Sequence, residues 1–169
     1  MRSPREQRRA TQRGEPVILF RVGESTFAIA ATAVDEIRNA QGLKPLRTAP
    51  DLTNSKVRYS LLRDGKFYFV VDATVHFKML PARATRVLVL RNTKTAVLVG
   101  DIDRMTEVCG VHPLPNAFRG AERNWYRGLA LLGAQPKHEV VPIVNPGAFL
   151  TKVEMQALGD AISTTELNS

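Results

Sequence analysis

Val17-Ile18-Leu19-Phe20-Arg21-Val22 recurs 70 positions later as Val87-Leu88-Val89-Leu90-Arg91-Asn92, and this repetition decides the fold. Both runs are short and rich in Val, Ile, Leu and Phe, which is typical of buried strands. A second pair follows in the same order, because Val34-Asp35-Glu36-Ile37 matches Met105-Thr106-Glu107-Val108 at an offset of 71. Two matches in one order indicate an internal duplication.

The duplication extends to the end of each half. Val70-Val71-Asp72 matches Ile143-Val144-Asn145 at an offset of 73, and the slow drift of the offset is what loop insertions produce. Short apolar runs separated by turn formers fill most of the sequence. The predicted strands are Val17–Val22, Thr26–Ala30, Phe67–Asp72, Arg86–Leu90, Ala96–Val99 and Glu139–Val144. Arg63-Asp64-Gly65-Lys66 predicts a hairpin turn between two strands.

The predicted fold is all-β with a helical minority. Halves of about 70 residues bury little surface alone, so they gain stability by packing together. Sheets of short strands remove their exposed edges best by closing into barrels. We expect two five-stranded barrels side by side, from about 16–81 and 82–144, with or without exchange of strands. A groove between them would suit a partner. Asn145 as cap and Pro146 at the first position predict a C-terminal helix over about 146–163, with Phe149, Val153, Ala157 and Ile162 on one face, followed by a flexible tail, 164–169.

Composition argues for a folded protein of a reducing compartment. The chain has 169 residues, 44% of them hydrophobic, and a single cysteine, Cys109, so it has no internal disulfide. No stretch reaches the roughly 20 apolar residues that span a bilayer, and the N-terminus has no apolar core like that of a secretory signal. The net charge is +8, and five arginines against one glutamate in 1–13 supply +4, half of it. We expect 1–15 to be a disordered basic tail.

Signatures of catalysis are missing from the sequence, which predicts no enzyme, no cofactor, no metal and no small-molecule substrate. It has no Gly-rich phosphate loop, no His-Glu-x-x-His and no Gly-x-Ser-x-Gly. Cys109 and His112 have a ligand-like spacing, but a structural zinc site needs four ligands, so a half-buried strand cysteine is the simpler interpretation. Asp101 and Asp103 share one side of a strand and are best interpreted as a solvated strand end.

An alternative function is nucleic-acid binding by a basic β-barrel. Phe67-Tyr68-Phe69 and Trp125-Tyr126 could stack on bases, and the basic tail could contact phosphates. The RNA-binding fold with such an aromatic strand also needs two amphipathic helices, which the sequence does not show. Core aromatics are therefore the favoured interpretation, and nucleic acid is not the expected partner.

Several motifs, taken in order, resemble the CheW family. Phe20 to Ile29 resembles its opening strand, Gly-Glu turn and second strand, and Val34 to Arg38 its Val-x-Glu-Ile-Arg segment. Leu62-Arg63 before Gly65, followed by Val70-Val71-Asp72, is similar to its Leu-Arg-Gly strand that ends in Val-Asp. Ile102-Asp103, Glu107-Val108, Tyr126-Arg127-Gly128-Leu129 and Ile143-Val144-Asn145 complete the order. The resemblance covers about 16–160.

The resemblance implies a non-catalytic adaptor built of two intertwined SH3-like barrels. Such adaptors couple a CheA-type histidine kinase to the cytoplasmic tips of methyl-accepting chemotaxis receptors. A cytoplasmic protein without direct membrane insertion, recruited to receptor arrays, is therefore expected. The pathway would be chemotaxis or a related chemosensory system such as twitching motility.

The resemblance also implies where partners bind. The family's receptor-contact positions map onto Val34, Glu36, Ile37, Leu62 and Arg63, and further candidate contacts are Arg38, Arg86, Met105 and Gly128. Strand alternation puts Val34 and Glu36 on one face and Asp35 and Ile37 on the other, so Val34 and Glu36 face outward if Ile37 anchors the core. The alternative is that Glu36 only keeps the strand solvated and pairs with Arg38 or Arg63. Departures from the family pattern, in Arg58–Gly65, at Phe69 and at Arg86, indicate a divergent member.

Overall fold

The computed structural model describes residues 14–46, 55–118, 120–133 and 138–167. Residues 1–13 of the expected basic tail lie outside this part of the chain. Within the described ranges, no helix is long and apolar enough to cross a membrane.

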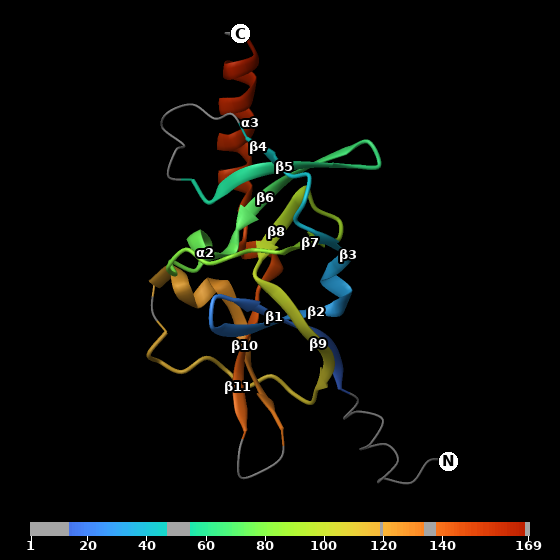
Figure 1. Ribbon diagram of the computed structural model, residues 1–169. Helices are drawn as coiled ribbons and strands as arrows, with labels where there is room; N and C mark the ends of the chain where they lie inside the picture. The colour runs from blue at the N-terminus through green and yellow to red at the C-terminus, as the bar shows by residue number, and fades with distance from the viewer. Residues whose placement is uncertain (1–13, 47–54, 119, 134–137, 168–169) are drawn as a thin grey trace, which may run out of the picture.

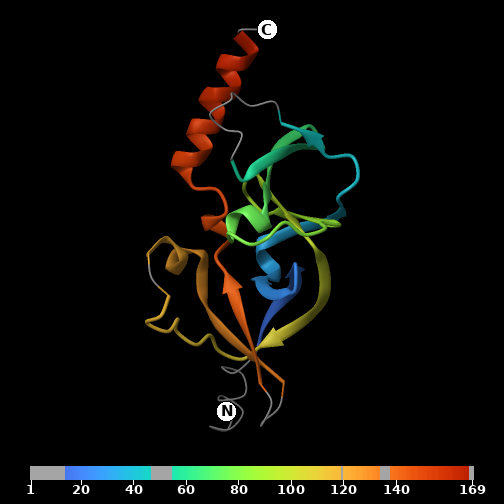
Figure 2. The same ribbon diagram turned by 60° about the vertical axis from the view of Figure 1, so that its left-hand side comes forward.

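Two β-sheets, stacked end to end in Figure 1 and again in Figure 2, form the body of the molecule. The first has the strand order β10-β11-β2-β1-β9 and the second the order β3-β7-β8-β6-β5-β4. The first sheet consists of β1 (Glu15–Val22), β2 (Ser25–Ala30), β9 (Asp101–Val108), β10 (Tyr126–Leu132) and β11 (Glu139–Val144). The second consists of β3 (Val34–Asn39), β4 (Lys44–Pro45), β5 (Val57–Arg63), β6 (Lys66–Asp72), β7 (Arg86–Leu90) and β8 (Thr95–Val99). The expected mainly β fold with two barrel-like units is confirmed, with the two-residue β4 as an additional edge strand.

The sequence duplication is visible in the strand order. When each strand of the first sheet is replaced by its repeat partner, the order becomes β5-β6-β8-β7-β3, which is the second sheet without β4. The parallel pair β11–β2 corresponds in the same way to the parallel pair β6–β8. Each sheet nevertheless takes strands from both halves of the chain, so the barrels do not coincide with 16–81 and 82–144. Strands are exchanged, and the two halves are intertwined.

Exchange of strands explains why the central strands are so apolar. One cluster of buried side chains lies inside the first barrel, a second inside the other, and a third, larger one between the two sheets. In β1, Val17 and Leu19 point into the first barrel, whereas Ile18 and Phe20 pack into the layer between the sheets. A strand that is buried on both faces has no solvated side and therefore shows no polar alternation.

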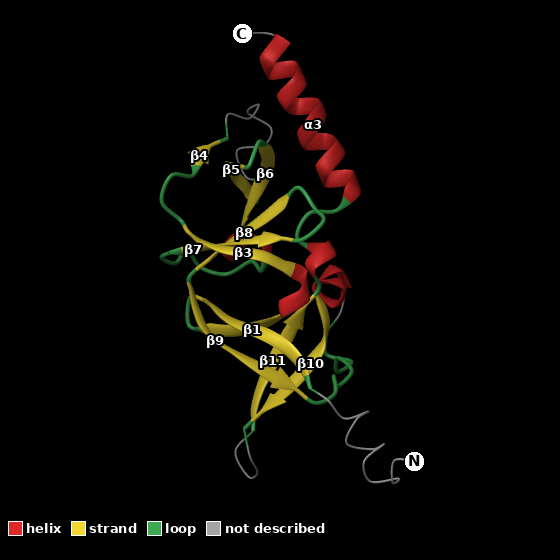
Figure 3. Ribbon diagram, turned by 90° about the vertical axis from the view of Figure 1, so that its right-hand side faces the viewer, coloured by secondary structure: helices red, strands yellow, loops and turns green. Residues whose placement is uncertain are grey.

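The hairpin between β5 and β6 has the predicted turn. Asp64 and Gly65 both have positive φ, 49° and 75°, the combination that a two-residue type I′ turn requires. Figure 3 shows this hairpin at one end of the molecule, beside α3 (Lys152–Leu167), which extends away from the sheets.

The C-terminal helix differs from the expected 146–163. The Asn145 side chain accepts a hydrogen bond from the Gly147 amide as predicted, but it caps only a 3-10 turn, Pro146–Ala148. A separate helix, α3, begins at Lys152 after Thr151 and Glu154 cap each other's backbone amides. It continues to Leu167, into the expected tail.

The predicted apolar face of this helix is wrong because the break shifts its register. Phe149 is fully buried, but Val153 is 78% exposed, and Leu158 contacts the core instead. The remaining short helices are η1 (Ala31–Ala33), α2 (Ala73–His76) and η3 (Gly120–Trp125).

Candidate functional site

Strand β3 carries four of the nine predicted contact residues, and a β-bulge interrupts its pairing with β7. Val34 pairs with Leu90, but Glu36 pairs with Val89, so Asp35 is an extra residue that has no partner position. Val34 is consequently buried between the sheets at 7% exposure, while Ile37 is 39% exposed. The expectation that Val34 faces outward and Ile37 anchors the core is therefore wrong. Val34, Glu36 and Arg38 share the less exposed face of β3, whereas Asp35, Ile37 and Asn39 lie on the exposed face.

Arg63, at the end of β5, binds both carboxylates of this bulge. Its Nε donates to Glu36, and its Nη1 donates to Asp35 Oδ2 at 3.0 Å and to the Tyr68 hydroxyl at 3.4 Å. The hydrogen bonds with Glu36 and Tyr68, together with the charge of Asp35, raise the pKa of Arg63 above its usual value. Only 19% of the Arg63 side chain is exposed. The contact fastens the edge strand β3 to the β5–β6 hairpin.

Two further arginines join this network at longer range. Arg38 lies 3.8 Å from Glu36, and Arg91 of the β7–β8 turn lies 3.8 Å from Asp35. We call these five residues, Asp35, Glu36, Arg38, Arg63 and Arg91, the Arg63 cluster. Three cations against two anions leave it with one positive charge. Because the side chains around Arg63 are half-exposed, the cluster is a surface that can exchange internal ion pairs for pairs with a partner.

The other predicted residues lie apart from the Arg63 cluster. Leu62 is 69% exposed on the opposite side of β5 from Arg63, where it pairs with Phe67. Arg86 is the first residue of β7 and pairs with Asn39, at the end of the β3–β7 pair that also contains Arg38.

Met105 and Gly128 belong to the first sheet, on β9 and β10. The structure therefore brings together Glu36, Arg38 and Arg63. Sequence reasoning missed Asp35, Tyr68 and Arg91, although Asp35 precedes the quoted Glu36 and could have been paired with an arginine.

A buried histidine connects α3 to the body. His76 of α2 is 5% exposed and lies among the rings of Phe77, Trp125 and Phe149. Its Nδ1 lies 3.2 Å from Lys56 Nζ, which in turn pairs with Glu154 of α3 at 3.0 Å. Since the ammonium can only donate, the imidazole accepts this hydrogen bond and is neutral. Burial first, and then the charge of Lys56, lower the pKa of His76 to about 4, against the raising effect of Glu154.

Acidification is expected to destabilise the protein through His76. The ordinary pKa of histidine is 6.5, and that of His76 in the folded protein is about 4. The contribution of the neutral His76 to the free energy of unfolding is therefore fully present above pH 6.5 and is lost as the pH falls toward 4. From pH 7 to pH 5 the free energy of unfolding should fall by about 2 kcal/mol for this group. Urea unfolding at both pH values measures this fall in the free energy of unfolding. In His76→Gln, whose side chain does not titrate, the fall should be smaller by about 2 kcal/mol. His112→Gln, at an exposed histidine, is the matched control and should keep the full fall.

The structure also shows where the candidate metal ligands, the cysteine and the aromatic residues of the alternative functions lie. Within the described part of the chain, no three His, Cys, Asp or Glu side chains are grouped as metal ligands. Cys109 is exposed in a bend after β9, so the half-buried strand cysteine was a wrong prediction. Trp125 and Tyr126 pack on Phe77 as core aromatics.

Comparison with known proteins gives one family and one fold. The family model of the CheW-like domain matches residues 16–154. The crystal structure of the scaffolding protein TtCheW from Thermoanaerobacter tengcongensis has a similar fold, with a TM-score of 0.64 at 14% sequence identity. The likeness covers 78% of this chain and 89% of that one. No curated protein sequence matches the chain.

Proposed function

We propose a scaffold function for this chain, which belongs to the CheW-like domain family. The family consists of non-catalytic proteins, and the match spans both barrels and the start of α3. We infer that the chain couples cytoplasmic receptor tips to a CheA-type histidine kinase in a chemotaxis or chemosensory-like pathway. It would work in the cytoplasm, at receptor arrays, without cofactor or substrate.

The Arg63 cluster is the observation that carries this proposal. A scaffold needs a surface whose shape and charge fit a partner, and it needs no reactive group. At the cluster, the half-exposed Glu36 and Arg38 alternate with the exposed Ile37 on an edge strand. A receptor helix that presents Leu or Val beside Arg or Asn would match an apolar side chain flanked by a carboxylate.

Reconstitution with the kinase and receptors of the same organism tests the proposal. The regulatory domain of the kinase and a receptor cytoplasmic fragment should each bind the purified protein, and kinase should sediment with receptor only when the protein is added. Binding of neither partner would contradict the scaffold function. If the protein instead bound a single-stranded oligonucleotide with affinity that falls steeply with salt, the nucleic-acid alternative would replace it.

A further inference from the structure

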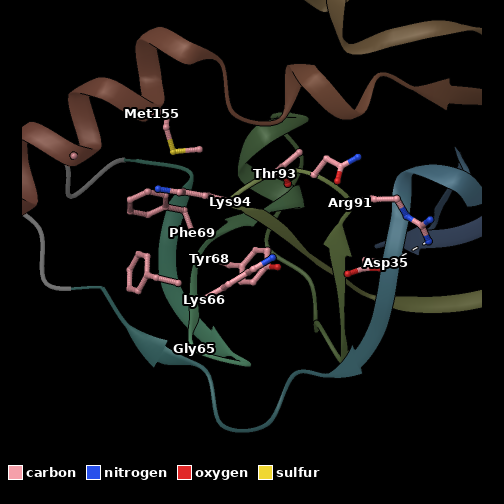
Figure 4. A pocket seen from close by; sticks show the side chains of 12 residues that line it. Asp35, Gly65, Lys66, Tyr68, Phe69, Arg91, Thr93, Lys94 and Met155 are labelled. Carbon is pink, nitrogen blue, oxygen red and sulfur yellow. Dashed lines mark ion pairs between the residues drawn. The ribbon is translucent and has the colours of Figure 1, made fainter.

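A groove of about 1100 Å³ lies beside the Arg63 cluster, and the scaffold function as proposed does not use it. Figure 4 shows its walls, which are the β5–β6 hairpin, the β7–β8 turn and one face of α3. Asp35 and Arg91, which form an ion pair, close one end of the groove, and α3 lies across the other. Glu36 and Arg63 are not among its lining residues.

The floor of the groove is apolar and partly open to solvent. Phe67 is 42% exposed and makes an edge contact with Phe69, whose ring centroid is 5.1 Å away. Met155 of α3 faces Phe69 from the opposite wall. A phenylalanine that is half in water and a flexible thioether beside it are typical of surfaces that bind another protein.

Gly159 supplies a second, independent observation. It lies one helical turn after Met155, so both residues share the face of α3 that lines the groove. Glycine is a poor residue inside a helix, and it is kept where another backbone must approach closely. Here a Cβ would meet nothing within 4 Å, so packing within the chain does not require this glycine. The space above Gly159 suits a second helix lying against α3.

The charge of the rim indicates the chemistry of the occupant. Lys66 and Lys94 are exposed on two walls, and neither has a carboxylate in salt-bridge distance within the described residues. Asp35, the only acidic residue of the described lining, is already paired with Arg63 and Arg91. The groove is therefore positive, and an acidic partner complements it.

We propose that this groove binds an acidic amphipathic helix of a partner protein. Apolar side chains of that helix pack on Phe67 and Met155, its backbone approaches Gly159, and its carboxylates pair with Lys66 and Lys94. This is the helix-in-groove mode of recognition, with anchors at i, i+3, i+4 and i+7. The groove shares Asp35 and Arg91 with the Arg63 cluster but does not include Glu36 or Arg63. Peptide binding in the groove can therefore be tested apart from receptor and kinase binding, through Lys66, Lys94 and Gly159, which lie outside the cluster.

Two synthetic peptides of equal length test the proposal on the full chain. Both carry Leu and Phe at i, i+3, i+4 and i+7, and their polar face is Glu in one and Lys in the other. The acidic peptide should bind, by fluorescence anisotropy, at least ten-fold more tightly than the basic one. The amide NMR signals of 65–69, 91–94 and 155–159 should shift on binding.

Variants locate the site without unfolding the protein. Gly159→Leu should weaken binding of the acidic peptide at least ten-fold with no loss of thermal stability, because it fills the groove and favours the helix. Lys66→Glu with Lys94→Glu should reverse the preference between the peptides. Phe67→Ala should also weaken binding of the acidic peptide. Val140→Ala is its matched control and should not, since Val140 and Leu131 form the exposed pair of the repeat-related hairpin that corresponds to Phe67 and Leu62.

Several results would overturn the proposal. They are equal binding of the two peptides, binding of neither, unchanged binding in Gly159→Leu, or NMR shifts confined to the first sheet. Displacement of the acidic peptide by a single-stranded oligonucleotide would assign the groove to nucleic acid instead. Self-association that Gly159→Leu abolishes would assign it to a second copy of this chain.

Discussion

Replacing Gly128 by alanine is expected to lower the free energy of unfolding by about 2–4 kcal/mol. The new methyl group would overpack its surroundings, and it would also displace the hydrogen-bonded bridge between His112 and Leu129. A Cβ at this position would lie 2.4 Å from Val111 Cγ1 and 2.5 Å from the His112 carbonyl oxygen. That carbonyl accepts from the Leu129 amide at 2.8 Å, and the His112 amide donates to the Leu129 carbonyl at 2.9 Å. The His112 carbonyl oxygen belongs to the backbone, which cannot move aside by a change of rotamer.

This bridge gives Gly128 a structural role. His112 and Leu129 form an isolated antiparallel bridge that ties the segment after β9 to β10, the two strands at the ends of the first sheet. Chemical denaturation of Gly128→Ala measures the cost, and Gly159→Ala is the control that should be neutral or stabilising, because its Cβ meets nothing. An unchanged midpoint for Gly128→Ala would show that the bridge is easily displaced, and Gly128 would then stay a candidate for partner contact.

The sequence was most informative where strands are buried on both faces. β1, β2, β7 and β8 occupy the middle of their sheets, so each had to be an uninterrupted apolar run, and the duplication was visible in them. Edge strands gave a weaker signal, because they mix exposed and buried residues in an order that a bulge can change. The sequence Val34-Asp35-Glu36-Ile37 has no signal for the bulge, because the bulge depends on pairing with β7 from the other half of the chain.

The C-terminal helix shows the opposite case, in which a local signal was present. Thr151-x-x-Glu154 is a capping box, and it predicts a helix start at Lys152. The Asn145-Pro146 signal six residues earlier is genuine too, but it begins only a 3-10 turn. Two start signals so close together are compatible with a break between them, and the buried Phe149 and Leu150 occupy that break.

The candidate site depended on more than local pattern. The pairing of Glu36 with Arg63 joins residues 27 positions apart in sequence, and the β5–β6 hairpin and the exchange of strands bring them together. Resemblance to the CheW family supplied both residues, whereas Asp35, Tyr68 and Arg91 appear only in three dimensions. Leu62 was selected with Arg63, but neighbouring residues of a strand face opposite ways, so Leu62 lies opposite Phe67 rather than in the Arg63 cluster.

Charge reversal at Glu36 should separate binding from stability. Glu36→Lys places a third cation between Arg38 and Arg63, and it removes the carboxylate that Arg63 binds through Nε. Because these are half-exposed surface pairs, the free energy of unfolding should fall by no more than about 1 kcal/mol. Receptor binding should weaken by about 1–3 kcal/mol, since a like charge would face the receptor's cation at a packed contact. Kinase binding, which we place on another surface, should persist.

The internal repeat provides a matched control for this experiment. Glu107 of β9 corresponds to Glu36 at the offset of 71, and it is exposed on the other barrel. Glu107→Lys makes the same change of charge on the same kind of strand, so it should leave receptor binding unchanged. Exchanging the pair, as Glu36→Arg with Arg63→Glu, should restore the ion pair between positions 36 and 63 but not the contact of Arg63 with Asp35. Only part of the stability and part of the binding should therefore return, because the partner also meets inverted charges. Isothermal titration with a receptor fragment measures all three proteins. If Glu36→Lys and Glu107→Lys bound equally well, the Arg63 cluster would not be the receptor site, and the exposed surface of β3 would have to be assigned to solvent.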